Sequence, residues 1–314
     1  MTKFKKIDLS KIKTYSVKER KSKVSLSDFA KPIGDDQTIG DFIENLPSIL
    51  SGHYFKEFLD DYTRSVKSKS TILLMMGAHV IKVGISPLII DAMKKGWITH
   101  LALNGACVIH DVEIALWGIT SEDVAEGIED GSFGMAKEST EFINLAVKNG
   151  KGSLGYGEAV ASALETSQGP YLEYSLLYNA FKMNIPFTVH SALGTEIIHQ
   201  HPSVDGAAVG DTTWTDFQIF TNNVSTLDKN ATVLNIGSAV IMPEVFLKAL
   251  TVARNLGYPA FGFSSATFDM IRHYRPTVNV VERPTQKKGK GYYFIGHHEI
   301  MLPLLFAALN SKLK

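Results

Sequence analysis

Residues 71–84 read Thr-Ile-Leu-Leu-Met-Met-Gly-Ala-His-Val-Ile-Lys-Val-Gly, and this stretch decides the fold class. Its first six residues, Thr71–Met76, lack the polar–apolar alternation of a strand that faces water on one side. Such a run predicts a strand covered on both faces of a parallel sheet. Six further short segments share the pattern: Ile98–Leu103, Pro186–His190, Thr232–Ile236, Pro259–Ser264, Thr277–Val281 and Gly291–Ile295.

Helical patterns separate these segments. Ser86-Pro87 offers an N-cap and a helix-compatible first position, and Gly96 follows the last turn of the same pattern. Apolar residues from Phe246 to Ala253 recur at helical spacing before Gly257. Because parallel strands need crossover connections, this alternation predicts an α/β fold: a doubly wound, mainly parallel sheet with helices on both faces.

The chain divides into an arm and one large domain. Residues 1–35 are polar and carry eight lysines in the first 23 positions, which predicts either a solvated surface arm or a binding element. We expect residues 36–314 to form a single α/β domain of nucleotide-binding type. It begins with a helical extension at Thr38–Asp61 and contains a helical insertion at about 120–183.

Composition excludes several classes of protein. The 314 residues include 32 Lys and Arg against 32 Asp and Glu, so no basic surface for a nucleic acid is indicated. No apolar run approaches the ~20 residues of a membrane span. Cys107 is the only cysteine, which excludes an intrachain disulfide and a cysteine-only metal site. With no apolar stretch behind the N-terminal lysines to predict a secretory signal, we expect a cytoplasmic protein without nucleic-acid or membrane partners.

Histidines follow the predicted strands. Ligands of open parallel sheets bind at the carboxyl ends of the strands, and seven of the ten histidines fall there. Two interpretations remain, a functional pocket or separate rings bonded to loop backbone. His199-x-His201 would point both rings to one side on an extended segment, as a metal pair does, whereas helical geometry would separate them by about 200°. We assign no metal ligands. The seven histidines are His79, His110, His190, His199, His201, His297 and His298.

Candidate catalytic residues come from the same loops. Imidazoles at these positions act as general acids or bases, so His110, His199 and His201 are candidate bases. Glu196 lies among them and is a candidate orienting group or base, although an acid there also caps a helix. Gly-, Ala- and Ser-rich loops suit a phosphate, but tight turns need the same residues. Neither a Gly-x-Gly-x-x-Gly fingerprint nor a Walker A motif is present.

From about Ser70 to Phe306 the order and spacing of these segments resemble the deoxyhypusine synthase family. Leu101–Asp111 is similar to the family's second strand and loop, and Pro186–Gly194 to its Pro-Ala-Leu-Thr-Asp-Gly-Ser segment. Leu234–Asn255 is similar to its Gly-Gly-Gly unit. Ser264-Ser265-Ala266-Thr267 stands where the family has Asn-Thr-Ala-Gln, and Tyr292–Leu305 resembles its closing segment.

The resemblance implies a Rossmann-like sheet, NAD at the strand ends, and a homotetramer with sites between subunits. It also implies a small amine substrate whose alkyl group passes through an imine with a lysine. The family's Ser-Trp-Gly-Lys motif has no match here, and the nearest lysines are Lys287, Lys288 and Lys290. The cofactor-facing positions carried over are Gly77, Ala78, His79, Asn104, Gly105, Ala106, Ser264, Ser265, Ala266, Gly296 and His297.

Three functions therefore follow from the sequence. The first is a deoxyhypusine synthase-like transferase that performs NAD-dependent aminoalkyl transfer or amine oxidation on a polyamine-like substrate with an altered, His-rich site. The second is a His-based enzyme, with or without a metal, that acts on an anionic small molecule. The third is a catalytically inactive nucleotide-binding homologue.

Overall fold

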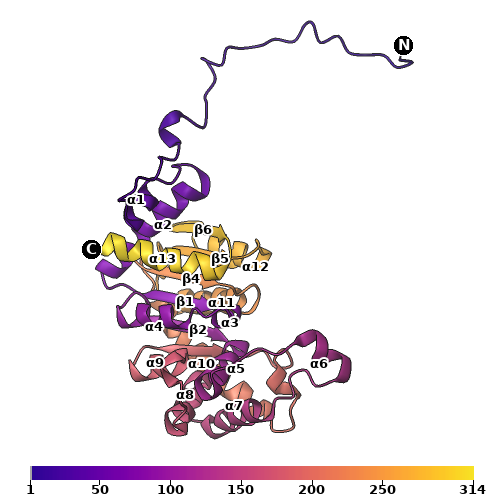
Figure 1. Ribbon diagram of the computed structural model, residues 1–314, viewed down its shortest axis with the longest axis vertical. Helices are drawn as coiled ribbons and strands as arrows, with labels where there is room; N and C mark the ends of the chain where they lie inside the picture. Colours follow the sequence, from indigo (N-terminus) through magenta and orange to yellow (C-terminus); the bar gives the residue numbers. More distant parts are fainter. Residues whose placement is uncertain (1) are drawn as a thin grey trace.

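A computed structural model describes residues 2–314, and its centre is a six-stranded, all-parallel sheet (Figure 1). The strands lie in the order β3-β2-β1-β4-β5-β6, so the order reverses between β1 and β4. Crevices at such a reversal are where ligands of open α/β sheets bind. The strands are β1 (Ile72–Met76), β2 (His100–Asn104), β3 (Phe187–His190), β4 (Thr232–Ile236), β5 (Ser264–Asp269) and β6 (Lys290–Ile295).

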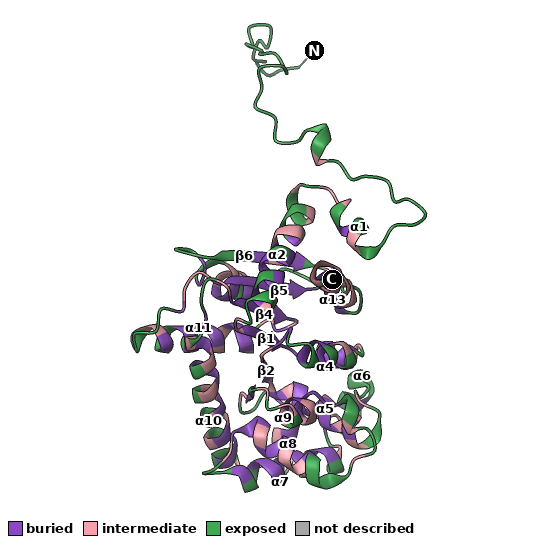
Figure 2. Cartoon of the chain, turned by 90° about the vertical axis from the view of Figure 1, so that its left-hand side faces the viewer, coloured by how far each residue is buried: buried purple, intermediate pink, exposed green. Residues whose placement is uncertain are grey.

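Helices cover both faces of the sheet. They are α1 (Ile39–Glu44), α2 (Leu50–Lys67), α3 (His79–Lys82), α4 (Ser86–Lys94), α5 (Gly105–Trp117), α6 (Val124–Asp130), α7 (Lys137–Gly150), α8 (Tyr156–Ser167), α9 (Leu176–Lys182), α10 (Gly206–Ser225), α11 (Ile241–Asn255), α12 (Tyr274–Pro276) and α13 (His298–Leu313). Figure 2 shows α10 and α11 on one side of the sheet and α4, α5 and α13 on the other. The predicted Rossmann-like α/β fold is confirmed.

Successive side chains of the central strand β1 face alternately into two apolar clusters of the core. Ile72, Leu74 and Met76 of β1 belong to the larger apolar cluster, with side chains from α2, α4, α5 and α13. Leu73 and Met75 belong to the second cluster, with side chains from α10 and α11. All five side chains are fully buried, which explains why the run showed no polar alternation.

Two strand predictions were wrong. Thr277–Glu282 forms a π-helix between α12 and β6, because a short buried apolar run serves a helix as well as a strand. The strand predicted at Pro259–Ser264 was placed too early, because the observed strand β5 begins at Ser264, where the predicted strand ended. Gly262 has a φ of +89°, which interrupts extended backbone, and β5 starts at Ser264 opposite Thr232 of β4.

The N-terminal part also differs from its prediction. The helical stretch expected at Thr38–Asp61 is two helices, α1 and α2, separated by a loop that contains Pro47. The α2 helix belongs to the helical layer itself, since it packs against α13 and the strands β5 and β6. Residues 2–24 extend away from the body and are exposed throughout (Figures 1 and 2).

The interval between β2 and β3 comprises the helices α5 to α9, and the segment 120–183 lies within it. The α6 helix lies outside the sheet layers, beside α5 and α7 (Figure 1). Among the described residues, no helix is long and apolar enough to span a membrane.

Candidate functional site

The carboxyl edge of the sheet is closely packed at the strand-order reversal. A Cβ at Gly77, after β1, would lie 2.1 Å from the carbonyl oxygen of Gly237, after β4. Gly237 has a φ of +63°, and a Cβ there would meet the ring of His298 at 2.8 Å. Only glycine allows this approach, which brings the loops after β1, β4 and β6 together.

Polar atoms without partners gather at this reversal. His298 is 1% exposed, its Nε2 lies 3.3 Å from the Phe268 carbonyl oxygen, and its Nδ1 has no partner among residues 2–314. Its ring centroid is 5.6 Å from that of His79. Asp269, the last residue of β5, accepts a hydrogen bond from the Met270 N–H, and its buried Oδ2 accepts no hydrogen bond from a described residue but lies 3.9 Å from His273 Nε2. Buried atoms of this kind mark a site where a ligand donor or acceptor would complete the bonding.

Glu196 lies at the N-terminus of α5. A Cβ at Gly105, the first residue of α5, would lie 2.0–2.2 Å from the Glu196 carboxylate, so only glycine leaves room for it. The carboxylate accepts hydrogen bonds from Ser191 Oγ at 3.1 Å and from the Ala192 N–H at 3.2 Å. Burial raises the pKa of Glu196 to about 7. The two hydrogen bonds favour the charged form and lower the pKa, but their effect is smaller.

His199 stands beside this carboxylate, with Nε2 3.7 Å from Glu196 Oε2 and 3.4 Å from Ser191 Oγ. Its Nδ1 accepts a hydrogen bond from the Gly194 N–H, which leaves the proton of a neutral ring on Nε2. Burial lowers the pKa of His199, so the ring is neutral at pH 7. The predicted pairing of Glu196 with a histidine is therefore present, with His199 as its partner.

A cavity of ≈170 Å³ opens beside Glu196 and reaches His110. His110 Nδ1 lies 2.7 Å from Thr120 Oγ1, whose hydroxyl donates to Glu113. Burial, together with the charge of Lys82, lowers the pKa of His110 to about 4. The cavity thus holds a neutral imidazole and a carboxyl group with a pKa near 7. The polar side chains that line it are Lys82, His110, Glu113, Ser121, Glu122, Thr195 and Glu196.

A second cavity, of ≈340 Å³, adjoins the first on its outer side, since both are lined by Glu113, Ser121 and Glu122. Trp117 and Glu138 complete its charged and aromatic wall. Carboxylates beside an indole ring favour a cation, by charge and by the interaction of a cation with the ring face.

Three other residues of these loops, His201, His297 and Cys107, do not line the cavity. His201 Nδ1 lies 2.8 Å from Ser203 Oγ, so the rings of His199 and His201 bind different partners. The His297 side chain is 65% exposed and lies 3.9 Å from Glu299. Cys107 is fully buried, and burial raises the pKa of its thiol far above the ordinary value. No group of three or more His, Cys, Asp or Glu side chains in residues 2–314 is arranged to hold a metal ion.

Two further polar residues near this edge cap helices. Asp111 accepts hydrogen bonds from Ser175 Oγ and from the N–H groups of Leu176 and Leu177 at the start of α9. It therefore caps that helix and fixes α9 against α5. Asn104 similarly caps α5, because its Oδ1 accepts from the Cys107 N–H at 3.2 Å.

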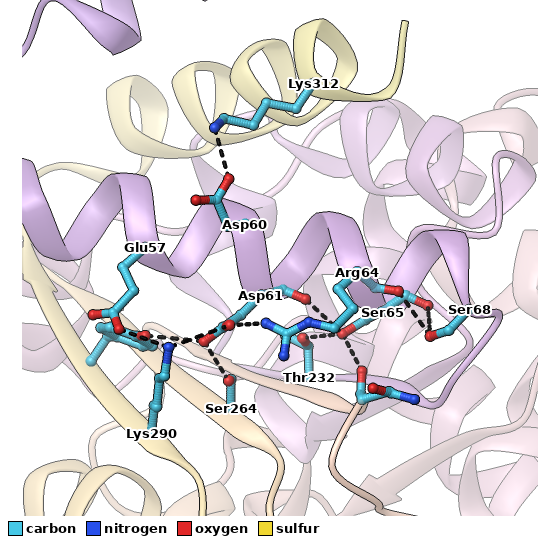
Figure 3. A network of polar contacts seen from close by, with 12 residues as sticks. Glu57, Asp60, Asp61, Arg64, Ser65, Ser68, Thr232, Ser264, Lys290 and Lys312 are labelled. Carbon is cyan, nitrogen blue, oxygen red and sulfur yellow. Dashed lines mark hydrogen bonds and ion pairs between the residues drawn. The ribbon is translucent and has the colours of Figure 1, made fainter.

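Ser264, Ser265 and Ala266 lie at the amino end of β5, on the opposite edge from the cavity. Figure 3 shows Ser264 bonded to Asp61 of α2, at 2.7 Å. Ser265 Oγ donates to the Val280 carbonyl oxygen. Their prediction as cofactor-facing residues rested on the misplaced strand, and it is wrong in this structure because the hydroxyls stabilise the far edge of the sheet.

Lys290 belongs to the same far edge. Its Nζ lies 2.7 Å from Glu57 Oε1 and 3.7 Å from Asp61 (Figure 3). Glu57 raises the pKa of Lys290, which makes the amine a weaker nucleophile at neutral pH. Lys287 and Lys288 precede it in an exposed turn, and none of the three lines the cavity.

Sequence reasoning missed two residues of the carboxyl edge. Asp269 was hidden because the strand before it was placed five residues too early. Lys82 lines the cavity from the last turn of α3, and its position directly after the first strand was the available signal.

Comparisons with known proteins bear on the fold. No protein-family model and no curated protein matches this chain. Among solved structures, a candidate deoxyhypusine synthase from Entamoeba histolytica superposes with a TM-score of 0.55 at 9% identity, covering 91% of this chain and 97% of the other. The likeness at this identity establishes a shared fold over nearly the whole length of both chains.

Two larger enzymes also share the fold. AgrE, crystallised as a ternary complex with ornithine and NAD+, gives a TM-score of 0.53 at 13% identity over 83% of this chain. The arginine dihydrolase ArgZ of cyanobacteria gives 0.50 at 15% identity over 84%. This chain spans 33% of the length of each.

Proposed function

We propose that this chain is an NAD-dependent enzyme that oxidises a small amine or transfers its alkyl group, with Glu196 as the proton acceptor. The observation that carries the proposal is the buried Glu196 carboxyl, with a pKa of about 7, beside a cavity lined by His110 and further carboxylates. A general base is most effective when its pKa lies near the working pH.

The charges of the cavities support a cationic substrate. Glu113 and Glu122 line both cavities, and Glu138 with Trp117 extends the acidic wall outward. His110 is neutral at pH 7, so Lys82 is the one positive charge that lines the inner cavity within the described part of the chain. An ammonium group is favoured here, whereas an anionic substrate would meet repulsion from three carboxylates.

The strand-order reversal supports NAD. AgrE, which shares the fold, binds NAD+. In this chain the Asp269 Oδ2, which accepts no hydrogen bond and lies 3.9 Å from His273 Nε2, suits a ribose hydroxyl, and the loops of Gly77 and Gly237 carry no side chain that would block a dinucleotide. The residues present therefore fit the cofactor, which would be held by the Gly77-Ala78-His79 loop, Gly237, Asp269 and His298. When bound, NAD supplies the acceptor for a hydride from the carbon next to nitrogen.

The chain's own residues would handle the proton. Removal of a hydride from an amine carbon requires that nitrogen lose a proton, and the Glu196 carboxylate is the acceptor. His199 and Ser191 hold the carboxylate in place. Loss of the hydride and the proton leaves an imine. Water hydrolyses it to a carbonyl compound with release of the nitrogen as an amine, or a second amine adds to it and displaces the first amine, in which case the hydride would return to the new imine and complete the transfer. Lys82 is the lysine that lines this cavity, so aminoalkyl transfer through a lysine would use Lys82.

The test uses the purified full chain with NAD+ and, separately, spermidine, ornithine and arginine. NADH absorbance reports turnover, and Glu196→Gln is expected to lower kcat by about 100-fold, the usual contribution of a general base. In the native chain kcat/KM should rise with pH through about 7, where Glu196 loses its proton, and this rise should disappear in the variant.

The matched control is Glu173→Gln, an exposed carboxylate outside both cavities, which should leave the rate unchanged. Lys82→Met separates the two reactions, because it should abolish transfer and leave NADH formation. A chain that binds no NAD+ in calorimetry, or a Glu196→Gln variant with the native rate and pH profile, would contradict the proposal. Turnover that persists after alanine replaces Lys287, Lys288 and Lys290 together would exclude an imine role for those lysines.

A further inference from the structure

The first 24 residues carry a concentrated positive charge. Residues 2–24, called the basic arm below, contain nine Lys and Arg side chains and two Asp and Glu side chains, a net charge of +7. None of these eleven side chains forms an ion pair with any residue of the described chain, 2–314. The charge of the basic arm is therefore uncompensated within one copy.

The basic arm is also unusually apolar for a solvated tail. Seven large apolar side chains are spaced two to seven residues apart along it and are between 49% and 84% exposed. Segments that remain disordered in water are poor in such side chains, because they gain nothing from exposing them. These residues are Phe4, Ile7, Leu9, Ile12, Tyr15, Val17 and Val24.

A surface of the opposite kind lies on the body. Residues 113–141, called the acidic face below, run from the second half of α5 through α6 to the start of α7. They contain eight Asp and Glu side chains and one Lys, a net charge of −7. Seven of the eight acids are exposed, and no exposed acid of this face forms an ion pair within the described residues. They are Glu122, Asp123, Glu126, Glu129, Asp130, Glu138 and Glu141.

The acidic face exposes apolar side chains among its acids. Five are between 41% and 74% exposed, and two of them, Trp117 and Ile119, line the cavity of ≈340 Å³. Exposed apolar groups mixed with charge of one sign are typical of a surface that a partner covers. The five are Trp117, Ile119, Val124, Ile128 and Met135.

The net charges of the basic arm and the acidic face are equal and opposite. The whole chain has a formal charge of zero, so the residues outside the basic arm and the acidic face also sum to zero. The +7 of the basic arm therefore matches the −7 of the acidic face, and both surfaces present apolar side chains at close spacing. Charge complementarity of this kind steers association and fixes the register of an interface.

The geometry favours a second copy over the same chain. The basic arm leaves the body near α1, which packs on α13 at the β6 end of the sheet. The acidic face lies around α6, toward the β2 and β3 end, and the arm extends in the other direction (Figure 1). In extended conformation 23 residues span up to about 80 Å, which is enough to reach a neighbouring molecule.

We infer that the basic arm of one copy docks on the acidic face of a second copy, with arm lysines against the carboxylates and arm apolar side chains against Trp117, Ile119 and Ile128. The acidic face shares Trp117 and three carboxylates with the cavity walls of the proposed function, so the tests below alter Glu126, Glu129 and Glu141, which line neither cavity. It explains why both surfaces are left exposed and unpaired in a single chain.

The first test is sedimentation of the full chain and of a variant that lacks residues 2–24, at several protein concentrations. The full chain should self-associate, and association should weaken at least tenfold when salt rises from 50 to 500 mM, since exposed charges are then screened. The truncated chain should lose this salt-dependent association. Circular dichroism shows whether the truncated chain keeps its fold.

The second test is a charge exchange between two variants. One carries Lys11→Glu, Lys13→Glu and Lys18→Glu in the basic arm. The other carries Glu126→Lys, Glu129→Lys and Glu141→Lys on the acidic face. Each alone should associate at least tenfold more weakly than the native chain, and an equimolar mixture should recover association, because the unaltered arm binds the unaltered face and the two altered surfaces also attract. Glu173→Lys, exposed elsewhere, is the matched control.

Three results would overturn the inference: a full chain that shows no salt-dependent association at any concentration, salt-dependent association that survives removal of residues 2–24, or a mixture that associates no better than its components. Binding of the monomeric full chain to vesicles with anionic lipid, lost on truncation, would assign the arm to a membrane surface instead.

Discussion

Each edge of the sheet buries a carboxylate, but the two carboxylates differ in their hydrogen-bond partners. At the amino edge Asp61 is 3% exposed and is bonded by Ser264 Oγ at 2.7 Å and Tyr292 OH at 3.0 Å, with Arg64 in contact as well (Figure 3). At the carboxyl edge Glu196 has two hydrogen bonds, a neutral histidine beside it, and an open cavity.

The difference separates a structural carboxylate from a reactive one. A buried carboxylate with its lone pairs occupied and a guanidinium in contact joins α2 to β5 and β6 and has nothing left to offer a ligand. A buried carboxylate with few donors keeps a raised pKa and can exchange a proton. Partner count and the open cavity together therefore distinguish Glu196 from Asp61, whereas the buried Asp216 has a raised pKa but lines neither cavity.

The largest expected effect is at the amino edge. Asp61→Asn removes the negative charge to which Ser264, Tyr292 and Arg64 donate. The amide N–H₂ of the new side chain is a donor itself, so the buried hydroxyls of Ser264 and Tyr292 lose their acceptor. We expect the free energy of unfolding to fall by about 3 kcal/mol, measured by urea denaturation.

The control for Asp61→Asn is Asp60→Asn on the same helix. Asp60 is 64% exposed and paired with Lys312, and an exposed pair of this kind is worth less than about 1 kcal/mol. Equal losses in the two variants would contradict the distinction between the edges, as would a change in NAD+ affinity caused by Asp61→Asn.

Glu196 should show the opposite stability behaviour. Its folded pKa of about 7 lies above the ordinary 4.5, so the folded state binds an extra proton between these values. The stability that this proton contributes is complete below about pH 4.5 and is lost as the pH rises through about 7. Glu196→Gln removes the titration. We expect the variant to gain on the order of 2 kcal/mol relative to the native chain between pH 5 and pH 8, from urea denaturation at each pH.

The comparison must be made as a difference between the two proteins. Asp111 and Asp216 are also buried and have pKa values raised to about 6 and about 7, so the native slope with pH has more than one source. Only the part that Glu196→Gln removes belongs to Glu196. Parallel curves for the two proteins would mean that Glu196 is ionised in both folded and unfolded states.

The sequence was sufficient for the sheet where a strand is buried on both faces and mainly apolar. Thr232–Ile236 was predicted with its observed bounds, and Ile72–Met76 within one residue. The sequence pattern did not predict the strand Ser264–Asp269, because its hydroxyl-bearing residues are typical of a loop. Their partners, Asp61 and the Val280 carbonyl, come from distant or adjacent elements that no local pattern shows.

The candidate site divides in the same way. Glu196, His110 and His199 follow predicted strands, and topology alone places them at one edge. The partners of each histidine decide whether it faces the cavity. His201 is bonded to Ser203, and His297 is exposed to solvent. Single-sequence patterns give the edge on which a residue lies, whereas the direction of its side chain is decided by packing among loops far apart in the chain.

The smallest effect tests the reassignment of β5. Ser264→Ala deletes one hydroxyl that donates to Asp61, and we expect a loss of about 1 kcal/mol in unfolding free energy, the usual net value of one hydrogen bond. NAD+ affinity, measured by calorimetry, should stay unchanged because Ser264 lies on the far edge. Gly77→Ala is the matched variant: its Cβ would meet the Gly237 carbonyl oxygen at 2.1 Å, displace the loops at the strand-order reversal, and weaken NAD+ binding at least tenfold. If Ser264→Ala weakened NAD+ binding while Gly77→Ala did not, the cofactor would bind at the amino edge, and the roles assigned to the two edges would be reversed.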